Sequence, residues 1–297
     1  MEEWIINKKE EGKRLDAFLM EKKEWPRSFF MKALRMNKIK VNGKKKEAPS
    51  RLAEGDRVRS FVLEKEREKS LPIPEILYED ERILAVNKPA GLLSMDEGKG
   101  KDTLLRRVND FLNGRGEGNA YPVHRIDFNT SGILLLAKDE EAGHILDRMI
   151  RERKVKKSYL CAVWGDVRPS RGRLQDYLFK DAKKNRVYVT EEGAKGSKTA
   201  VMDYEKKSYK NGLSLVECRL ITGRTHQIRC QMAHHGYPLL GDNKYGFKEK
   251  NRRIGERRQL LCSYRMTFAF GSEAGPLAYL SGKTIQISSI PFVKKYF

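Results

Sequence analysis

One carboxylate of this sequence stands in a setting suited to chemistry. Asp127 follows His124-Arg125-Ile126 and precedes a run of turn-forming residues that ends at Gly132. An ionised carboxylate presented by such a loop can attack an electrophilic carbon or stabilise positive charge that develops on it. The alternative interpretation is that Asp127 only closes an Asx-type turn.

The segments around this loop predict the elements that must hold it. The aliphatic run 133–137 directly after the loop predicts a buried strand. Asp139 is suited to cap a helix, because Glu140 and Glu141 then lie at the positive end of the helix dipole. Further strands are predicted at residues 83–86, 155–165, 187–190, 199–204 and 214–220, and a further helix at 225–235, closed by Gly236.

Strands dominate this part of the chain, and the helices do not alternate with them regularly. This pattern predicts an α+β fold, with a mixed, largely antiparallel sheet and flanking helices, and not a doubly wound sheet. Two basic segments, 180–186 and 248–258, lack apolar periodicity, and we predict that both are loops.

The first 63 residues predict a small α/β unit of their own. Apolar residues recur at helical spacing in 15–19 and in 30–34, and Ile39 and Val41 then alternate with lysines before a turn at Asn42-Gly43. Residues 64–76 predict a linker, since their charges alternate and two prolines forbid regular structure. The larger domain is therefore predicted at 77–297.

The charge of the chain indicates a polyanionic partner. Lys and Arg number 61 against 40 Asp and Glu, which gives a net charge of +21. Residues 27–46 hold eight basic residues and no acidic one, a pattern that favours phosphate binding over a solvated helix face. An anionic membrane surface is the alternative, but it would require a basic amphipathic helix or an anchor, and the sequence shows neither.

Other features favour a cytoplasmic protein without a metal or cofactor. The acidic N-terminus is unlike a signal peptide, and the longest aliphatic run is too short to span a membrane. The four cysteines, at 161, 218, 230 and 262, are scattered and are expected to be reduced and mostly buried. The sequence contains neither a Gly-x-Gly-x-x-Gly motif nor a P-loop.

The stretch around Asp127 resembles the signature His-Arg-Leu-Asp-x-x-Thr-Ser-Gly of the RluA-type pseudouridine synthases. Three further segments resemble motifs of the same family and follow in the same order: 80–91 (Asp-Glu-Arg-Ile-Leu-Ala-Val-Asn-Lys-Pro-Ala-Gly), 157–165 (Lys-Ser-Tyr-Leu-Cys-Ala-Val-Trp-Gly), and 222–229 (Thr-Gly-Arg-Thr-His-Gln-Ile-Arg) with Gly241-Asp242 and Tyr245-Gly246. Together they cover residues 78–246. The resemblance implies an enzyme that isomerises uridine in RNA, without a cofactor.

The resemblance also implies roles for single residues. Asp127 would be the essential catalytic residue, Arg229 its ion-pair partner, and Tyr159 a ring packed on the flipped uracil. Arg125 would fill the space that the flipped base leaves. Ordinary alternatives are a phosphate contact for either arginine and core packing for the tyrosine. The expected substrate-binding set is completed by His124 and Thr130, which would brace the loop, and by Arg224, Thr225 and His226, which could bind a phosphate at a helix start.

Residues 1–63 resemble an S4-type RNA-binding domain. Its RNA-binding face would include Arg27, Lys32, Arg35, Lys38 and Lys40. The larger domain departs from its family at three places. Phe128 stands where an arginine is usual, so a phosphate or bracing contact is missing or is replaced by apolar packing. Residues 92–95 differ from the usual Leu-x-Val-His-Pro, and residues 261–268 lack both histidines of the last motif. These departures concern substrate choice more than activity.

We therefore predict a monomeric isomerase that flips uridine out of structured RNA and exchanges its glycosidic bond with the help of Asp127. The S4-like unit favours large-subunit ribosomal RNA, 23S-type or in an assembling subunit, over transfer RNA. Two alternatives are a transfer-RNA uridine isomerase and a non-catalytic RNA-binding or ribosome-assembly factor on the same scaffold. An Asp-based hydrolase would need a general base and usually a second carboxylate, which the loop lacks.

Overall fold

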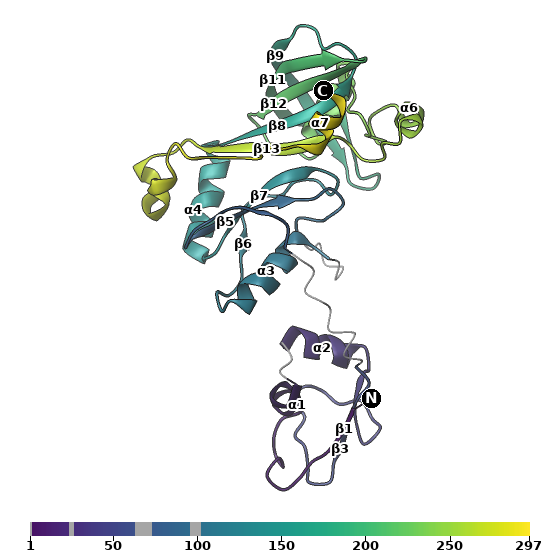
Figure 1. Ribbon diagram of the computed structural model, residues 1–297, viewed down its shortest axis with the longest axis vertical. Coiled ribbons are helices and arrows are strands. Elements are labelled where there is room, and N and C mark those ends of the chain that lie inside the picture. The colour runs from purple at the N-terminus through teal and green to yellow at the C-terminus, as the bar shows by residue number, and fades with distance from the viewer. Residues whose placement is uncertain (1, 24–26, 63–72, 96–101) are drawn as a thin grey trace. The chain divides into compact units, whose positions relative to one another are not determined.

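The computed structural model describes residues 2–23, 27–62, 73–95 and 102–297. The chain divides into two units, residues 1–71 and 72–297, which are described separately (Figure 1). Most of the predicted linker, 64–76, lies outside the described residues, and its last residue begins the first strand of the second unit.

The first unit pairs two helices with a three-stranded antiparallel sheet. The helices are α1 (Leu15–Lys23) and α2 (Arg27–Arg35), and the strands β1 (Glu2–Ile5), β2 (Ile39–Val41) and β3 (Arg57–Ser60) lie in the order β1-β3-β2. Residues that recur at helical spacing, such as Phe18 and Phe30, are buried with Ile39 and Val58 in one core. At the predicted turn, Asn42 and Gly43 have φ angles of 51° and 77°, the left-handed values that a tight hairpin requires.

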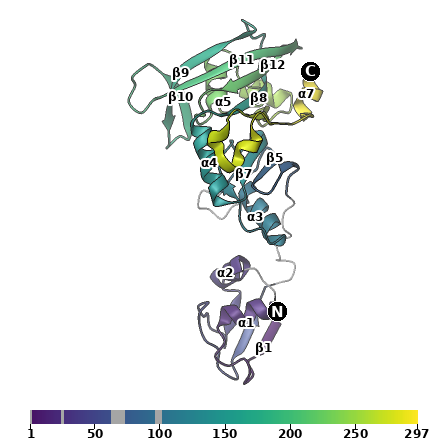
Figure 2. The same cartoon turned by 90° about the vertical axis from the view of Figure 1, so that its left-hand side faces the viewer.

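The second unit is built on an eleven-stranded sheet (Figures 1 and 2). The strands are β4 (Ile76–Glu79), β5 (Ile83–Lys88), β6 (Tyr121–Pro122), β7 (Ser131–Ala137), β8 (Val155–Trp164), β9 (Arg171–Asp181), β10 (Arg186–Thr190), β11 (Lys198–Lys210), β12 (Leu213–Leu220), β13 (Leu261–Phe268) and β14 (Thr284–Gln286). Their order is β10-β9-β11-β12-β8-β13-β7-β5-β4, with β14 on β13 and β6 on β7. Every described pair in this sheet is antiparallel except β13 with β7. The predicted α+β class with a mixed, largely antiparallel sheet is confirmed.

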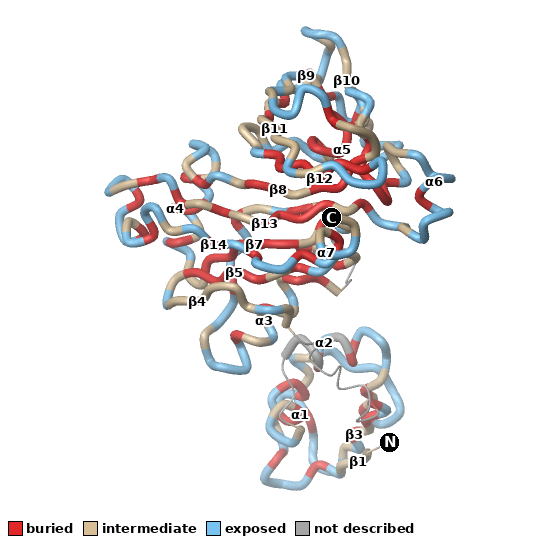
Figure 3. The backbone as a smooth tube through the Cα atoms, turned by 45° about the horizontal axis from the view of Figure 1, so that its top comes forward, coloured by how far each residue is buried: buried red, intermediate tan, exposed pale blue. Residues whose placement is uncertain are grey.

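Helices cover both faces of this sheet, so its central strands are buried on both sides (Figure 3). Ile83 and Ala85 of β5 pack in one core with α4 (Glu140–Arg151), the 3-10 helix η2 (Ser272–Leu280) and α7 (Pro291–Tyr296). Leu84 and Val86 point to the other face, into a core shared with α3 (Leu104–Gly114) and α5 (Gln227–His234). Alternate strand residues point to opposite faces, which explains this division. As predicted, the Asp139 side chain caps α4 by accepting a hydrogen bond from the Ala142 N–H at 2.8 Å.

The parallel contact of β13 with β7 depends on one glycine. Gly132, at the start of β7, lies opposite Ser263 and has a φ of 110°. A Cβ atom at Gly132 would lie 2.2 Å from the Ser263 carbonyl oxygen, so any side chain would push the strands apart. This close approach brings the end of the Asp127 loop against β13.

Both basic segments predicted as loops contain regular structure. In 180–186, β9 continues to Asp181 and β10 starts at Arg186, so only 182–185 form a turn. In 248–258, residues Lys248–Arg253 form helix α6. This helix is held by a polar contact and not by an apolar face: Asn251 is fully buried, and its Oδ1 accepts hydrogen bonds from Trp164 Nε1 at 3.1 Å and the Gly241 N–H at 3.0 Å.

Three further observations concern the described part of the chain. It contains no helix that is long and apolar enough to cross a membrane. Within the same residues, no group of three or more His, Cys, Asp or Glu side chains could hold a metal ion. All four cysteines are free and buried, as predicted.

Candidate active site

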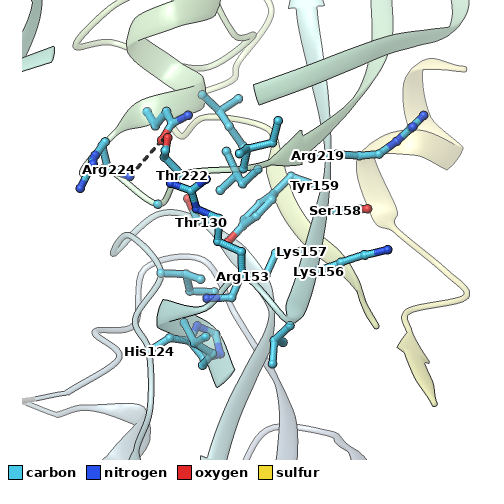
Figure 4. Close-up of a pocket in the computed structure, with 18 of the residues that line it drawn as sticks. His124, Thr130, Arg153, Lys156, Lys157, Ser158, Tyr159, Arg219, Thr222 and Arg224 are labelled. Atoms are coloured by element: carbon cyan, nitrogen blue, oxygen red, sulfur yellow. Dashed lines mark hydrogen bonds between the residues drawn. The ribbon is translucent and has the colours of Figure 1, made fainter. Parts of the chain in front are cut away.

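A pocket of about 970 Å³ lies beside the Asp127 loop (Figure 4). The loop forms one part of its wall, and the end of α4, the strands β8 and β13, the end of β12 and the start of α5 form most of the rest. It therefore brings together parts of three of the four motif segments. All the predicted catalytic residues, Asp127, Tyr159 and Arg229, line this pocket.

The end of β5 and the residues that follow it, 88–94, hold the Asp127 loop in place. Lys88 is fully buried, and its Nζ donates hydrogen bonds to the carbonyl oxygens of Leu92 at 2.7 Å and Phe128 at 3.2 Å. The Gly91 N–H donates to the same Phe128 oxygen at 2.8 Å. Ser94 Oγ donates to the Ile126 carbonyl at 2.9 Å and accepts from the Ile126 N–H at 3.2 Å. These contacts tie the backbone on either side of Asp127 to the end of β5.

Burial lowers the pKa of Lys88 to about 8, although the negative charge of Asp127 opposes this shift. The ammonium group is therefore still largely protonated at neutral pH and places a positive charge behind the loop. Sequence analysis quoted Lys88 within a motif but assigned no role to it or to Ser94.

His124 and Thr130, which were predicted to brace the loop, both make hydrogen bonds within this part of the chain. His124 Nε2 accepts a hydrogen bond from the Leu135 N–H of β7 at 3.0 Å. Burial holds the pKa of His124 well below its usual value, so the ring is neutral and can accept this bond. The Thr130 backbone N–H donates to the Asp127 carbonyl oxygen at 3.0 Å, and the residue is 2% exposed.

Arg229 contacts two carboxylates from the first half of α5. Its Nη1 lies 3.4 Å from Asp127 Oδ2, which is the predicted ion pair. The tighter contact is with Asp242, which accepts from Nε at 2.6 Å and from Nη2 at 3.0 Å. Burial opposes the charge on both groups of this inner pair, but their mutual hydrogen bonds outweigh it, raising the pKa of Arg229 and lowering that of Asp242. Asp242 thus fixes the arginine that faces Asp127.

Asp242 is a residue whose role sequence analysis missed. The motif Gly241-Asp242 was noted, but the arginine was paired with Asp127 alone. The sequence carries no local signal for this role, because the need for a second carboxylate follows from the burial of Arg229, whose five N–H donors require partners.

Tyr159 projects from β8 into the pocket (Figure 4). Only 7% of the residue is exposed. Burial raises the pKa of Tyr159 to about 12, and the charge of Asp127 acts in the same direction. The phenol therefore keeps its proton at neutral pH and offers a ring face and a hydroxyl group.

The residues before α5 lie at the pocket rim. The helix begins at Gln227, two residues later than predicted, because His226 has a left-handed backbone with φ 52°. Arg224 and His226 line the pocket, whereas Thr225 is exposed outside its lining. Arg224 Nε donates to the Thr199 carbonyl oxygen at 2.9 Å, and its backbone N–H donates to Gln227 Oε1 at 3.0 Å. Arg125 also lines the pocket and is exposed, two residues before Asp127.

The rest of the pocket wall is strongly basic. Arg153, Lys156 and Lys157 have no ion-pair partner among the described residues, and burial lowers the pKa of Lys157 to about 8. The basic residues of this wall that sequence analysis did not select are Arg151, Arg153, Lys156, Lys157, Arg219 and Arg265. The dense basic run 151–157, interrupted by a single glutamate, was the signal that could have revealed part of it.

Comparison with known proteins decides the family. The model of the RNA pseudouridylate synthase family matches residues 82–234, which is more than half of the chain. An uncharacterized RNA pseudouridine synthase of Aquifex aeolicus is 35% identical over 255 residues, which cover 81% of this chain and 79% of that protein. The ribosomal large subunit pseudouridine synthase C of Escherichia coli is 35% identical over 273 residues, 84% of this chain and 82% of its own length.

The chain belongs to the RNA pseudouridylate synthase family. Its members are isomerases, so the predicted family and enzyme class are confirmed. The fold agrees: human RNA pseudouridylate synthase domain containing 1 superposes with a TM-score of 0.54 at 23% identity, over 74% of this chain and 93% of that one. Human RNA pseudouridylate synthase domain containing 4 superposes with a TM-score of 0.54 at 24% identity, over 64% of this chain and 82% of that one.

Within this pseudouridine synthase, Phe128, which departs from the family, is 49% exposed. The loop is braced at this position through the Phe128 carbonyl oxygen. The unusual segment 92–95 also takes part in bracing, through Ser94 and the Leu92 carbonyl. In the altered last motif, Ser263 lies opposite Gly132 and Tyr264 Oη donates to Glu217 at 2.8 Å.

Proposed function

We propose that this isomerase converts uridine to pseudouridine in large-subunit ribosomal RNA, using Asp127 as its single catalytic carboxylate. The observation that carries the proposal is that Asp127 lies beside a buried arginine in a pocket with a strongly basic wall. Such a pocket suits a nucleotide that is still joined to its phosphates. Relatives named as ribosomal large subunit pseudouridine synthases support the choice of RNA.

The reaction breaks the N1–C1′ bond of uridine, forms a C5–C1′ bond and releases the hydrogen from C5 as a proton. The Asp127 carboxylate attacks C1′ or stabilises positive charge there while N1 leaves with the bonding electrons. The freed uracil turns within the pocket and C5 bonds to C1′, which breaks any bond that Asp127 had formed with C1′. Loss of the C5 proton restores the ring double bond, and N1 takes up a proton from water, so the product is an isomer of uridine.

The neighbouring side chains support this chemistry in different ways. Arg229, fixed by Asp242, places its positive charge beside the Asp127 carboxylate and orients it. Tyr159 offers its ring face to the freed uracil, because a phenol that keeps its proton at neutral pH cannot act as a ready base. Arg125, at the rim, fills the space that the base leaves in the RNA.

The unpaired cations Arg153, Lys156 and Lys157 contact phosphates next to the target nucleotide. His124 and Thr130 keep the loop in position. Arg224, Thr225 and His226 lie at the start of α5, where the exposed side chains of Arg224 and Thr225 can bind a phosphate of the RNA.

We further propose that the first unit is an S4-like RNA-binding domain, joined through 64–76 to a catalytic domain at 77–297. Arg35 is exposed at the end of α2, Lys38 directly precedes β2, and Lys40 lies on β2. The side chains of Arg27 and Lys32, which complete the proposed face, lie outside the described residues. Eight basic residues without an acidic one in 27–46 support a phosphate-binding surface. The enzyme would act as a monomer in the cytoplasm, on 23S-type RNA or an assembling large subunit.

Tritium release tests this function. RNA carrying tritium at uridine C5, prepared as the ribosomal RNA of cells that lack this protein, should release one tritium per uridine converted, without chain cleavage and in the presence of a chelator. Asp127→Asn is isosteric but removes the carboxylate charge, so it should abolish release while RNA binding remains. Release at the wild-type rate by Asp127→Asn would refute the role of Asp127. Tight binding without release by the wild-type protein would favour a non-catalytic RNA-binding factor, and release from transfer RNA alone would refute the ribosomal substrate.

A further inference from the structure

The His226 ring spans the distance between Asp127 and a tyrosine. Its Nδ1 lies 2.8 Å from the Tyr245 hydroxyl oxygen, and its Nε2 lies 3.9 Å from Asp127 Oδ2. The imidazole is mostly buried, with 11% of the side chain exposed. Either ring nitrogen of a neutral histidine can carry the proton, so the partner of Nδ1 decides what Nε2 offers to the carboxylate.

The contacts of the Tyr245 hydroxyl favour one arrangement of hydrogen bonds, the one in which its own proton has an acceptor. Its oxygen accepts from the Val187 N–H of β10 at 2.8 Å. Burial raises the pKa of Tyr245 to about 12, so the hydroxyl keeps its proton. His226 Nδ1 is the one acceptor within hydrogen-bond distance of that proton among the described residues. Tyr245 therefore donates to Nδ1, which must carry a lone pair.

The charge state of His226 agrees with this arrangement. Burial lowers the pKa of His226 to about 4, with the charges of Arg229 and Lys244 acting in the same direction and those of Asp127 and Asp242 opposing. The ring is neutral at neutral pH, and its single proton is on Nε2. The opposite tautomer would turn a nitrogen lone pair toward the carboxylate.

We propose that Tyr245 holds His226 in the tautomer whose Nε2–H faces Asp127, so that His226 and Arg229 together hold Oδ2 and leave Oδ1 to the substrate. Arg229 Nη1 approaches the same Oδ2 at 3.4 Å, and Oδ1 has no hydrogen-bond partner among the described residues. His226 and Tyr245 are then positioning residues. The proposal rests on the proposed catalytic role of Asp127.

Two further features support it. His226 has φ 52° and ψ 22°, a left-handed conformation that costs energy for any residue with a side chain and that an active site can retain for function. Asp242 Oδ1 accepts from the Tyr245 N–H at 3.1 Å, while the same carboxylate binds Arg229. One buried carboxylate thus holds Arg229 directly and also holds the backbone of the tyrosine that contacts His226.

Nitrogen NMR of the full-length protein, labelled with ¹⁵N in its histidines, tests the tautomer directly. The His226 signals are assigned by their loss in His226→Asn. At pH 7 the wild-type ring should show a protonated Nε2 and a bare Nδ1, and Tyr245→Phe should yield a mixture of tautomers. A protonated Nδ1 in the wild type, or an unchanged Nε2–H form in Tyr245→Phe, would overturn the proposal.

Kinetics test the consequence for Asp127. Asparagine tolerates the left-handed backbone and can accept from Tyr245, but it cannot reach Asp127. His226→Asn and Tyr245→Phe should each lower kcat by about three- to tenfold with little change in KM, because an N–H group 3.9 Å from Oδ2 contributes no more than one hydrogen bond would. The matched control is Tyr237→Phe, which removes a hydroxyl that accepts from the Arg168 N–H at 3.2 Å outside the pocket and should leave kcat unchanged.

Full activity of His226→Asn would overturn the proposal. Absence of tritium release by the wild-type protein would instead contradict the proposed function, and the tautomer measured by NMR would stand independently of it.

Discussion

At the scale of single residues, Asp242 organises the site without facing the pocket. Only 1% of the residue is exposed, yet it binds Arg229 through two oxygens and accepts from the backbone N–H groups of Lys244 and Tyr245. A buried ion pair of this kind contributes little net stability while intact, but removal of one partner leaves an uncompensated charge. Its value lies in fixing the position of the arginine.

Asp242→Asn should therefore destabilise the second unit by about 3–5 kcal/mol and strongly lower tritium release. Urea unfolding, followed by Trp164 fluorescence in a Trp4→Phe, Trp25→Phe background, measures the loss. The control is Glu249→Gln, which breaks the exposed 2.8 Å pair with Arg252 and should cost less than about 1 kcal/mol. Equal stability of Asp242→Asn and Glu249→Gln would contradict the structural role of Asp242.

Two buried histidines make stability depend on pH. Burial places the folded-state pKa of His226 at about 4 and that of His124 well below the ordinary value near 6.5. Below about pH 6.5 the unfolded chain binds protons that the folded chain does not, so the free energy of unfolding should fall as the pH falls from about 6.5 toward 4. Each histidine contributes a slope of up to about 1.4 kcal/mol per pH unit.

The same urea titrations between pH 7 and pH 5 measure this slope. His226→Asn should reduce it. The comparison variant is His144→Asn, on the exposed surface of α4, which should keep the wild-type slope. A wild-type free energy of unfolding that stays constant over this range would rule out a neutral, buried state for both rings.

At the scale of elements, the active-site loop is held by the end of β5 and the segment after it. Lys88 and Ser94 together contact the carbonyl oxygens on both sides of Asp127. The loop therefore has little freedom before RNA binds, which favours catalysis by positioning.

Ser94→Ala should remove two buried hydrogen bonds to Ile126, destabilise the second unit by ~1–3 kcal/mol and lower kcat more than it changes KM. Ser281→Ala is the matched control, because its hydroxyl donates to the Phe270 carbonyl at 2.6 Å and does not line the pocket. If both variants lose stability but keep the wild-type kcat, the hydrogen bonds of Ser94 to the Asp127 loop have no part in catalysis.

The same scale explains what the sequence could and could not predict. Apolar runs and caps are local signals, so the strand after Asp127 and the helix capped by Asp139 were predicted correctly. Helix α6 was not predicted because its sequence has no apolar periodicity. It is anchored instead by the buried side-chain amide of Asn251. The Arg229–Asp127 contact, between residues 102 positions apart, was expected only from family resemblance. The role of Asp242 depends on tertiary geometry that no local pattern encodes.

At the scale of the whole molecule, the excess of positive charge is shared by the two units. The second unit has the basic pocket wall, and the first has the basic run 27–46. A polyanion that binds both units would gain from each set of contacts, and salt would weaken each set.

Deletion of residues 1–71 should weaken binding to ribosomal RNA and leave slow turnover, since all proposed catalytic residues lie in the second unit. Each phosphate contact that is lost should reduce the log–log salt slope by about 0.7–0.9. RNA binding measured across a salt series, with the intact chain as reference, determines the difference. An unchanged slope would exclude the first unit from the RNA interface.

The burial of all four cysteines has a practical consequence for following this enzyme at work. Burial raises the pKa of the Cys230 and Cys262 thiols to about 11. The pKa of the Cys161 thiol lies well above the usual range, because Cys161 contacts the Cys218 thiol and is buried. Thiols are reactive as thiolates, so the native protein should resist maleimide dyes. One cysteine introduced on the surface of each unit would then be labelled selectively, and energy transfer between the two dyes would report how far apart the units lie, with and without RNA.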